Sequence, residues 1–225
     1  MTRVPTVLSV DEVQRIIEAI QPTRIYRLMA ELLYGTGMRV SEVCTLRVPD
    51  IDLGRAQISI RSGKGDKDRI VMLPLCLRDR LSGQVDTVGR RWRQDAARGG
   101  GYAPVADELD HKRPRACREL PWRFVFPSSI MRRDESGYGK RWHADSSALD
   151  RVIDQATRRA GVNKRVTCHT FRHSFATHVL EAGYDIRQVQ TLLGHASVKT
   201  TMIYTHVMNK PAIAVTSPLD RLKVL

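Results

Sequence analysis

Apolar residues recur at intervals of three and four positions along most of this 225-residue chain, a spacing typical of amphipathic helices. The first helix is expected to begin after Ser9, because Glu12 follows it at the capping-box distance, and to end before Pro22. The same spacing predicts further helices over residues 26–34, 74–93, 147–160 and 169–182, and a helical run that ends in the LLGH sequence, 192–195. The chain is therefore expected to be mainly α-helical.

The pattern changes between residues 56 and 73, where apolar and polar residues alternate. Ile58 and Ile60 have polar neighbours on both sides, and a second β-rich run follows at 70–73. The tip between the two runs, SGKGDKD, contains two glycines that can adopt a positive φ. This segment predicts a β-hairpin. The fold class expected for residues 1–225 is α+β, mainly helical with a small antiparallel hairpin or three-stranded sheet.

The net charge of the chain indicates the kind of partner that it binds. The formal net charge is +13, and 42% of the residues are hydrophobic, so the chain is expected to fold and to bind a polyanion. No apolar run approaches membrane-spanning length and the basic residues are spread along the chain, which favours nucleic acid over a membrane surface. The N-terminus has no secretory signal, and the cysteines form no C-x-x-C pair, which predicts reduced thiols in a cytoplasmic protein: Cys44, Cys76, Cys117 and Cys168.

Candidate chemistry is concentrated between residues 169 and 206. His169 and Arg172 are three positions apart, so they project from neighbouring positions on a helix, and an imidazole beside a guanidinium suggests a bound phosphate. His195 follows Gly194, an expected helix C-cap, and Tyr204 comes nine positions later. A metal pair formed by His169 and the histidine at 173 is disfavoured, because the glutamate of H-E-x-x-H is absent.

A second candidate anion site lies upstream. Gly35 and Gly37 are expected to form a tight turn that leads into a short helix, and Arg39 falls near its first residue. Backbone N–H groups at a helix start favour an anion, and the arginine adds a planar fork of donors. The alternative is that Arg39 only pairs with Glu42, one turn further on.

Together these residues resemble the tyrosine recombinases of the phage-integrase family, whose signature is Arg, Lys, His-x-x-Arg, His and Tyr in that order. The residues that match it are Arg39, Lys64, His169, Arg172, His195 and Tyr204. The resemblance implies that Tyr204 attacks a DNA phosphodiester to form a 3′-phosphotyrosyl link, while the arginines and His195 stabilise the developing charge. Lys64 would protonate the leaving oxygen, with Lys67 a nearby competitor, and His169 would assist proton transfer. No metal or other cofactor is implied.

Residues 101–127 are dense in charge and proline before they reach an apolar run. They resemble the extra segment of integron integrases through Lys112, Pro114, Glu119, Trp122, Phe124, Phe126 and Pro127. The resemblance predicts an insertion that grips a flipped-out base or a distorted backbone, although a solvated loop is the simpler interpretation. The residues expected to contact DNA are Lys67, Lys112, Arg113, Arg115, Trp122, Arg141, Lys164 and Arg165.

The function implied is site-specific DNA recombination, with integron cassette integration and excision as the first interpretation. Alternatives are a phage integrase, a chromosome-dimer resolvase, a topoisomerase-like relaxing enzyme and a DNA-binding regulator without catalysis. The resemblance covers only the catalytic domain, so we expect the family's N-terminal core-binding domain to be absent from this chain. Residues 217–225 are expected to form a tail helix that docks on a neighbouring protomer, giving a tetramer on DNA. Three further histidines are expected to be structural or to support the catalytic residues: His173, His178 and His206.

Overall fold

The computed structural model describes residues 5–21, 25–61, 68–105, 112–113, 115–134 and 137–206. Their α-helices are α1 (Val10–Ala19), α2 (Ile25–Thr36), α3 (Val40–Thr45), α4 (Arg78–Ala97), α6 (Ser146–Arg159), α7 (Cys168–Glu181), α8 (Ile186–Leu193) and α9 (Val198–Met202). The strands are β1 (Ile51–Asp52), β2 (Gln57–Ile60), β3 (Arg69–Met72), β4 (Arg132–Arg133) and β5 (Gly139–Lys140). Short 3₁₀ helices are η1 (Val48–Asp50), η2 (Leu75–Leu77), η3 (Ala116–Arg118), η4 (Leu120–Trp122) and η5 (Ile203–His206).

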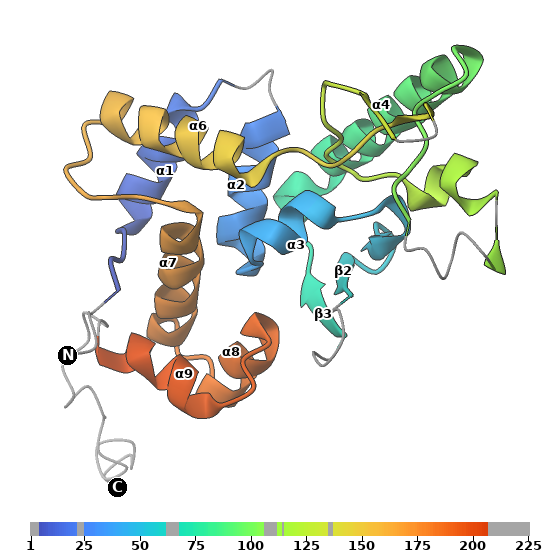
Figure 1. Cartoon of the computed structure of the whole chain (residues 1–225). Helices are drawn as coiled ribbons and strands as arrows, with labels where there is room; N and C mark the ends of the chain where they lie inside the picture. Colours follow the sequence, from blue (N-terminus) through green and yellow to red (C-terminus); the bar gives the residue numbers. More distant parts are fainter. Residues whose placement is uncertain are drawn as a thin grey trace, which may run out of the picture.

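The helical body is built on α2 and α7, which pack against each other at its centre (Figure 1). Helix α1 packs on α6, and its capping box is formed as predicted by Ser9 and Glu12. The inward faces of these helices are apolar, and Leu32, Leu33 and Phe171 are fully buried between them. Burial of this apolar surface is the main force that holds the helices together.

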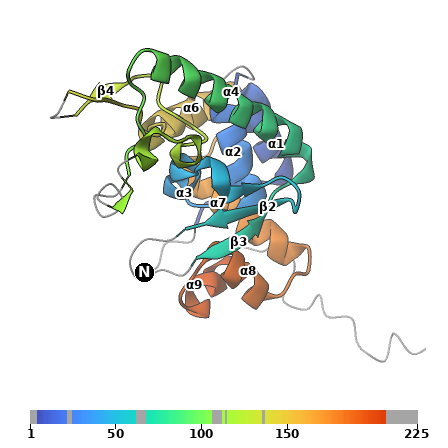
Figure 2. The same cartoon turned by 90° about the vertical axis from the view of Figure 1, so that its right-hand side faces the viewer.

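The three-stranded sheet has the order β1-β2-β3 and is antiparallel throughout, with Ile58 opposite both Ile51 and Val71. Its inner face is buried, whereas Ile70 and Met72 point to solvent. Helix α8 packs beside β3, as Figure 2 also shows. The structure confirms the predicted fold class, a mainly helical domain with a small antiparallel sheet.

Two local predictions were wrong. Gly35 lies inside α2 and makes no turn; a side chain there would collide with the Pro74 ring at 2.7 Å. The turn is made by Gly37 alone, at a φ of +67°. The basic and glycine-rich composition of residues 137–141 predicts a loop, but Gly139–Lys140 form strand β5 of a hairpin with β4. No apolar alternation marks this segment as a strand.

The cysteines have no disulfide partners, and Cys44 and Cys168 are buried. Burial raises the pKa of the Cys44 thiol to about 11, so it stays protonated. In the part of the chain that the structure describes, every helix is too short or too polar to cross a membrane.

Candidate active site

Arg172 lies at the centre of the site, on α7, and is only 5% exposed. Its guanidinium donates hydrogen bonds to the Gly37 carbonyl at 2.5 Å and to the Leu193 carbonyl at 2.6 Å. Burial lowers its pKa to about 10, and the positive charge of Arg39 acts in the same direction. The guanidinium therefore remains charged at neutral pH and joins the turn after α2 to the end of α8.

His195 is held in a defined tautomer beside Arg172. Its Nε2 lies 3.1 Å from Nη2 of Arg172, and its Nδ1 lies 3.0 Å from the Thr201 hydroxyl. Because a guanidinium can only donate, Nε2 accepts, and the ring proton is assigned to Nδ1. Burial, followed by the charge of Arg172, lowers the pKa of His195 to about 4. The His195 imidazole is therefore neutral at pH 7 as long as it is hydrogen-bonded to Arg172.

Gly194 explains why His195 reaches this position. It ends α8 in the left-handed conformation, with φ +63°, and its backbone caps the last turn. A side chain there would also approach the Arg69 guanidinium to 2.9 Å. Glycine is therefore required both by the backbone and by the close packing of the arginine.

Arg39 caps the start of α3 and belongs to an ion-pair network centred on Glu42. Its Nη1 lies 2.9 Å from Oε1 of Glu42, and its Nη2 donates to the Gly194 carbonyl at 3.4 Å. Arg69, on β3, donates two further bonds to the same carboxylate, at 2.9 and 2.7 Å, and a third to the Leu192 carbonyl. Both the predicted anion site and the alternative pairing of Arg39 with Glu42 are therefore compatible with this geometry. Sequence reasoning missed Arg69.

Glu42 makes this network pH-dependent. Burial alone would raise its pKa, but the hydrogen bonds and charge of Arg69, with the backbone N–H of Arg39, hold that pKa below its ordinary value. A carboxylate with a lowered folded-state pKa stabilises the fold above its unfolded pKa of about 4.3. That contribution is lost as the pH falls from there through the lowered folded-state pKa.

We expect Arg69→Met to lower the free energy of unfolding by about 3 kcal/mol at pH 7, because it breaks a buried ion pair. The acid-dependent part of the stability should also shrink, since Glu42 loses its main charge partner. Urea unfolding at pH 7 and pH 4 measures both effects. The matched control is Arg158→Met, which breaks an exposed pair with Asp154 and should change stability by less than about 0.5 kcal/mol. Equal losses in the two variants would contradict the role of Arg69.

Tyr204, on η5, is only 2% exposed. Its hydroxyl lies 3.0 Å from Nδ1 of His173, and its ring stacks at 6.3 Å from the His195 ring. Burial raises the pKa of Tyr204, and the charge of Arg172 partly opposes that rise. Of the two roles expected for His173, a structural one or support of a catalytic residue, this contact with the phenol agrees with the second, whereas His169 is exposed one turn earlier on α7.

The model of the phage integrase family matches residues 6–210. The chain belongs to the phage integrase family. An "Integrase/recombinase" of Escherichia coli is 46% identical over 224 residues, which are 99% of this chain and 66% of that protein. The chain thus spans about two thirds of the length of this curated relative, and less of others.

Solved structures of two recombinases are similar to this fold. A crystal structure of XerA recombinase matches with a TM-score of 0.65 and 36% identity, covering 93% of this chain and 63% of that one. A post-cleavage complex of the XerH site-specific recombinase with palindromic difH substrate matches with a TM-score of 0.63 and 25% identity, covering 92% and 51%.

The structure brings together four of the six residues that match the family signature, namely Arg39, Arg172, His195 and Tyr204. His169 lies next to them, and its ring centroid is 6.5 Å from that of His173. Lys64 and Lys67 lie outside the described residues, as does the predicted tail at 217–225. The described residues contain no cluster of three or more metal-ligating side chains, and metal-free chemistry stays a prediction.

The residues predicted to contact DNA fall into two groups. Arg141 is turned into the protein, where it makes a bidentate ion pair with Asp95 at 2.6 and 2.8 Å. Lys164 pairs with Glu12 at 2.6 Å. The others are exposed or half-buried on the surface: Lys112, Arg113, Arg115, Trp122 and Arg165. Arg141 therefore offers little surface to a DNA backbone, whereas Lys164 is exposed and Arg113 likewise has an ion-pair partner, Glu119 at 3.7 Å. A DNA contact by any of these residues stays a prediction.

Proposed function

We propose that this chain cuts and rejoins DNA at specific sites through a 3′-phosphotyrosyl intermediate on Tyr204. The observation that carries the proposal is the convergence of two cationic side chains, Arg39 and Arg172, with His195 and the buried phenol of Tyr204. Each comes from a different element, so their meeting is a property of the fold and not of local sequence. Metal-free phosphoryl transfer needs this set of groups.

The chemistry follows from the charges. A phosphodiester under attack builds negative charge on its nonbridging oxygens, and the two guanidinium groups are placed to offset it. Arg172 would exchange a carbonyl partner for a phosphate oxygen. The phosphate charge would also raise the pKa of His195, turning Nε2 from an acceptor into a donor. Tyr204 would displace the 5′-oxygen, and Lys64 would protonate it.

A trapped covalent adduct tests this function. Sites are first selected by binding from a random pool of duplex and hairpin oligonucleotides, and are then resynthesised with a 5′-bridging phosphorothiolate, whose thiol leaving group cannot reseal the strand. We expect an adduct that survives denaturing electrophoresis, forms equally in EDTA and disappears on proteolysis. Binding without any adduct would favour the non-catalytic regulator, and chelator-sensitive cleavage restored by Mg²⁺ would contradict the metal-free mechanism.

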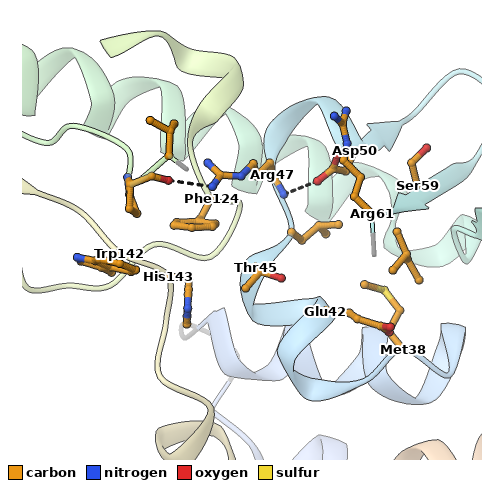
Figure 3. Close-up of a pocket in the computed structure, with 14 residues that line it drawn as sticks. Met38, Glu42, Thr45, Arg47, Asp50, Ser59, Arg61, Phe124, Trp142 and His143 are labelled. Carbon is orange, nitrogen blue, oxygen red and sulfur yellow. Dashed lines mark hydrogen bonds and ion pairs between the residues drawn. The ribbon is translucent and has the colours of Figure 1, made fainter. Parts of the chain in front are cut away.

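For the substrate, we propose folded single-stranded hairpins with extrahelical bases, the DNA of integron cassette recombination. Support comes from an open pocket of about 370 Å³ between α3, the sheet and the 101–127 insertion (Figure 3). Trp142 and His143 flank it, and Phe124 packs edge-on against His143 at 5.2 Å. Arg47, which precedes η1, stacks on Phe124 at 4.4 Å and donates to the Pro104 carbonyl, so it joins the insertion to the segment that follows α3. Aromatic walls of this kind suit a flipped-out base.

We expect a hairpin with extrahelical bases to compete better than a scrambled duplex of equal length at near-physiological salt. Trp142→Ala should weaken hairpin binding roughly fivefold or more, since one base stack contributes about 1–3 kcal/mol, and leave duplex binding unchanged. Tyr184→Ala, another exposed aromatic outside the pocket, is the control. Equal affinity for both DNAs would favour a duplex-specific phage integrase or chromosome-dimer resolvase, which the likeness to XerA supports. Plasmid relaxation without two-site recombination would indicate the topoisomerase-like enzyme.

A further inference from the structure

The Tyr204 hydroxyl has a proton acceptor that the family signature does not include. His173 Nδ1 lies 3.0 Å from the phenolic oxygen, and the two ring centroids are 5.5 Å apart. His173 follows Arg172 directly on α7, so one turn of helix presents a phosphate-binding cation and a partner for the nucleophile. Among the described residues, the imidazole hydrogen-bonded to the phenol is that of His173, whereas the ring of the signature histidine, His169, lies 6.5 Å from the His173 ring.

The hydrogen bond has a direction. Burial lowers the pKa of His173, and the neighbouring His169 and Arg172 act in the same sense. The imidazole is therefore neutral at pH 7 and has one ring nitrogen with a free lone pair. Burial raises the pKa of Tyr204, so the phenol keeps its proton. The protonated phenol donates to Nδ1 when the neutral imidazole carries its own proton on Nε2, which is the tautomer assigned here.

We propose that His173 is the general base of strand cleavage. As the Tyr204 oxygen forms its bond to phosphorus, Nδ1 of His173 takes the phenolic proton, the bond from phosphorus to the 5′-oxygen breaks, and that oxygen takes a proton from Lys64. In resealing, the 5′-hydroxyl attacks phosphorus and returns its proton to Lys64, the bond from phosphorus to the Tyr204 oxygen breaks, and His173 returns the phenolic proton to Tyr204. The inference rests on the proposed function and adds a catalytic residue to it.

The surroundings of the pair leave room for DNA. A pocket of about 370 Å³ opens beside it and is lined by His169 and His173 of α7 and by Ile203, the neighbour of Tyr204. Arg165 also lines this pocket. A backbone phosphate in the pocket would therefore lie beside a cation and beside the imidazole that contacts the nucleophile. Titratable and charged groups that face His173 or line its pocket are His169, Arg172, His195, Tyr204 and Arg165.

The test compares two histidines with the same kind of partner on the same helix. His178 Nδ1 lies 2.9 Å from the hydroxyl of another tyrosine, Tyr34, so His178→Asn makes the same change at an equivalent hydrogen bond without altering the partner of the nucleophile. His173→Asn keeps a hydrogen-bonding group near Nδ1 but no base, and His173→Gln is a second variant. Thermal unfolding of all three variants confirms that each is folded before rates are compared.

We expect His173→Asn to slow single-turnover adduct formation about 10²- to 10³-fold, while His178→Asn stays near the wild-type rate. A sulfur leaving group needs no general acid. A 5′-phosphorothiolate substrate should therefore restore the rate of adduct formation of Lys64→Ala, which lacks the acid, but not that of His173→Asn, which lacks the base. The wild-type rate should fall as the pH drops and His173 is protonated, and the variant should lack that limb of the profile.

A folded His173→Asn variant that cleaves within about threefold of wild type, or faster, overturns the assignment. So does rescue of that variant by sulfur, because the defect would then lie in the leaving group. Failure of the wild-type chain to form any adduct would instead refute the proposed function itself, so the two failures are distinguishable.

Discussion

Tyr204→Phe is expected to abolish the covalent adduct and leave DNA binding nearly unchanged. The phenol is the group held between His173 and the His195 ring, and the substitution removes only its oxygen. Binding should persist because affinity for DNA is dominated by contacts between cations and phosphates, which one buried hydroxyl does not make. Stability should fall by about 1 kcal/mol, the contribution of one internal hydrogen bond.

The measurement is denaturing electrophoresis with the phosphorothiolate substrate, beside a binding titration at fixed salt. Tyr34→Phe is the matched control, because it loses the equivalent hydrogen bond to His178 and leaves the nucleophile in place, so it should still form the adduct. A Tyr204→Phe protein that still becomes linked to DNA would require another nucleophile, which peptide mapping of the adduct would identify.

Local cues predicted the framework of the site well. A capping box correctly predicted the start of α1. A glycine after an apolar run correctly predicted the end of α8, and with it the position of His195. These cues act within one helical turn, so they can be seen without knowledge of the fold. The turn before α3 was only half right, because Gly35 serves close packing against Pro74, a contact between residues far apart in sequence.

The parts that sequence reasoning missed depend on such long-range contacts. Arg69 sits in a four-residue strand where it looks like a solvent-facing cation, yet its partner Glu42 lies on α3. For His173, the available signal was its place four residues after His169 on one helix, a spacing that suggested only a metal pair. Its actual partner, Tyr204, is brought to it by the fold of α8 and α9.

The network also shows that the two arginines of the site differ in what they do for the fold. Arg172 is buried and holds two backbone carbonyls, those of Gly37 and Leu193. Arg39 is 34% exposed at its side chain and shares Glu42 with Arg69, so the carboxylate keeps a partner without it. Loss of Arg39 should therefore slow catalysis without a large loss of stability, whereas loss of Arg172 should lower both.

We expect Arg39→Ala and Arg172→Ala each to slow cleavage about 10²- to 10³-fold, the usual effect of losing one donor to a developing oxyanion. Only Arg172→Ala should also destabilise the protein strongly, by about 1–3 kcal/mol for each buried carbonyl left without a donor. Single-turnover adduct rates and urea unfolding of both variants measure the two effects. Arg172→Lys separates them further, because an ammonium keeps the charge but not the fork that spans both carbonyls. If Arg39→Ala cleaves at the wild-type rate, the turn before α3 binds no scissile phosphate, and Arg39 serves only to position Glu42.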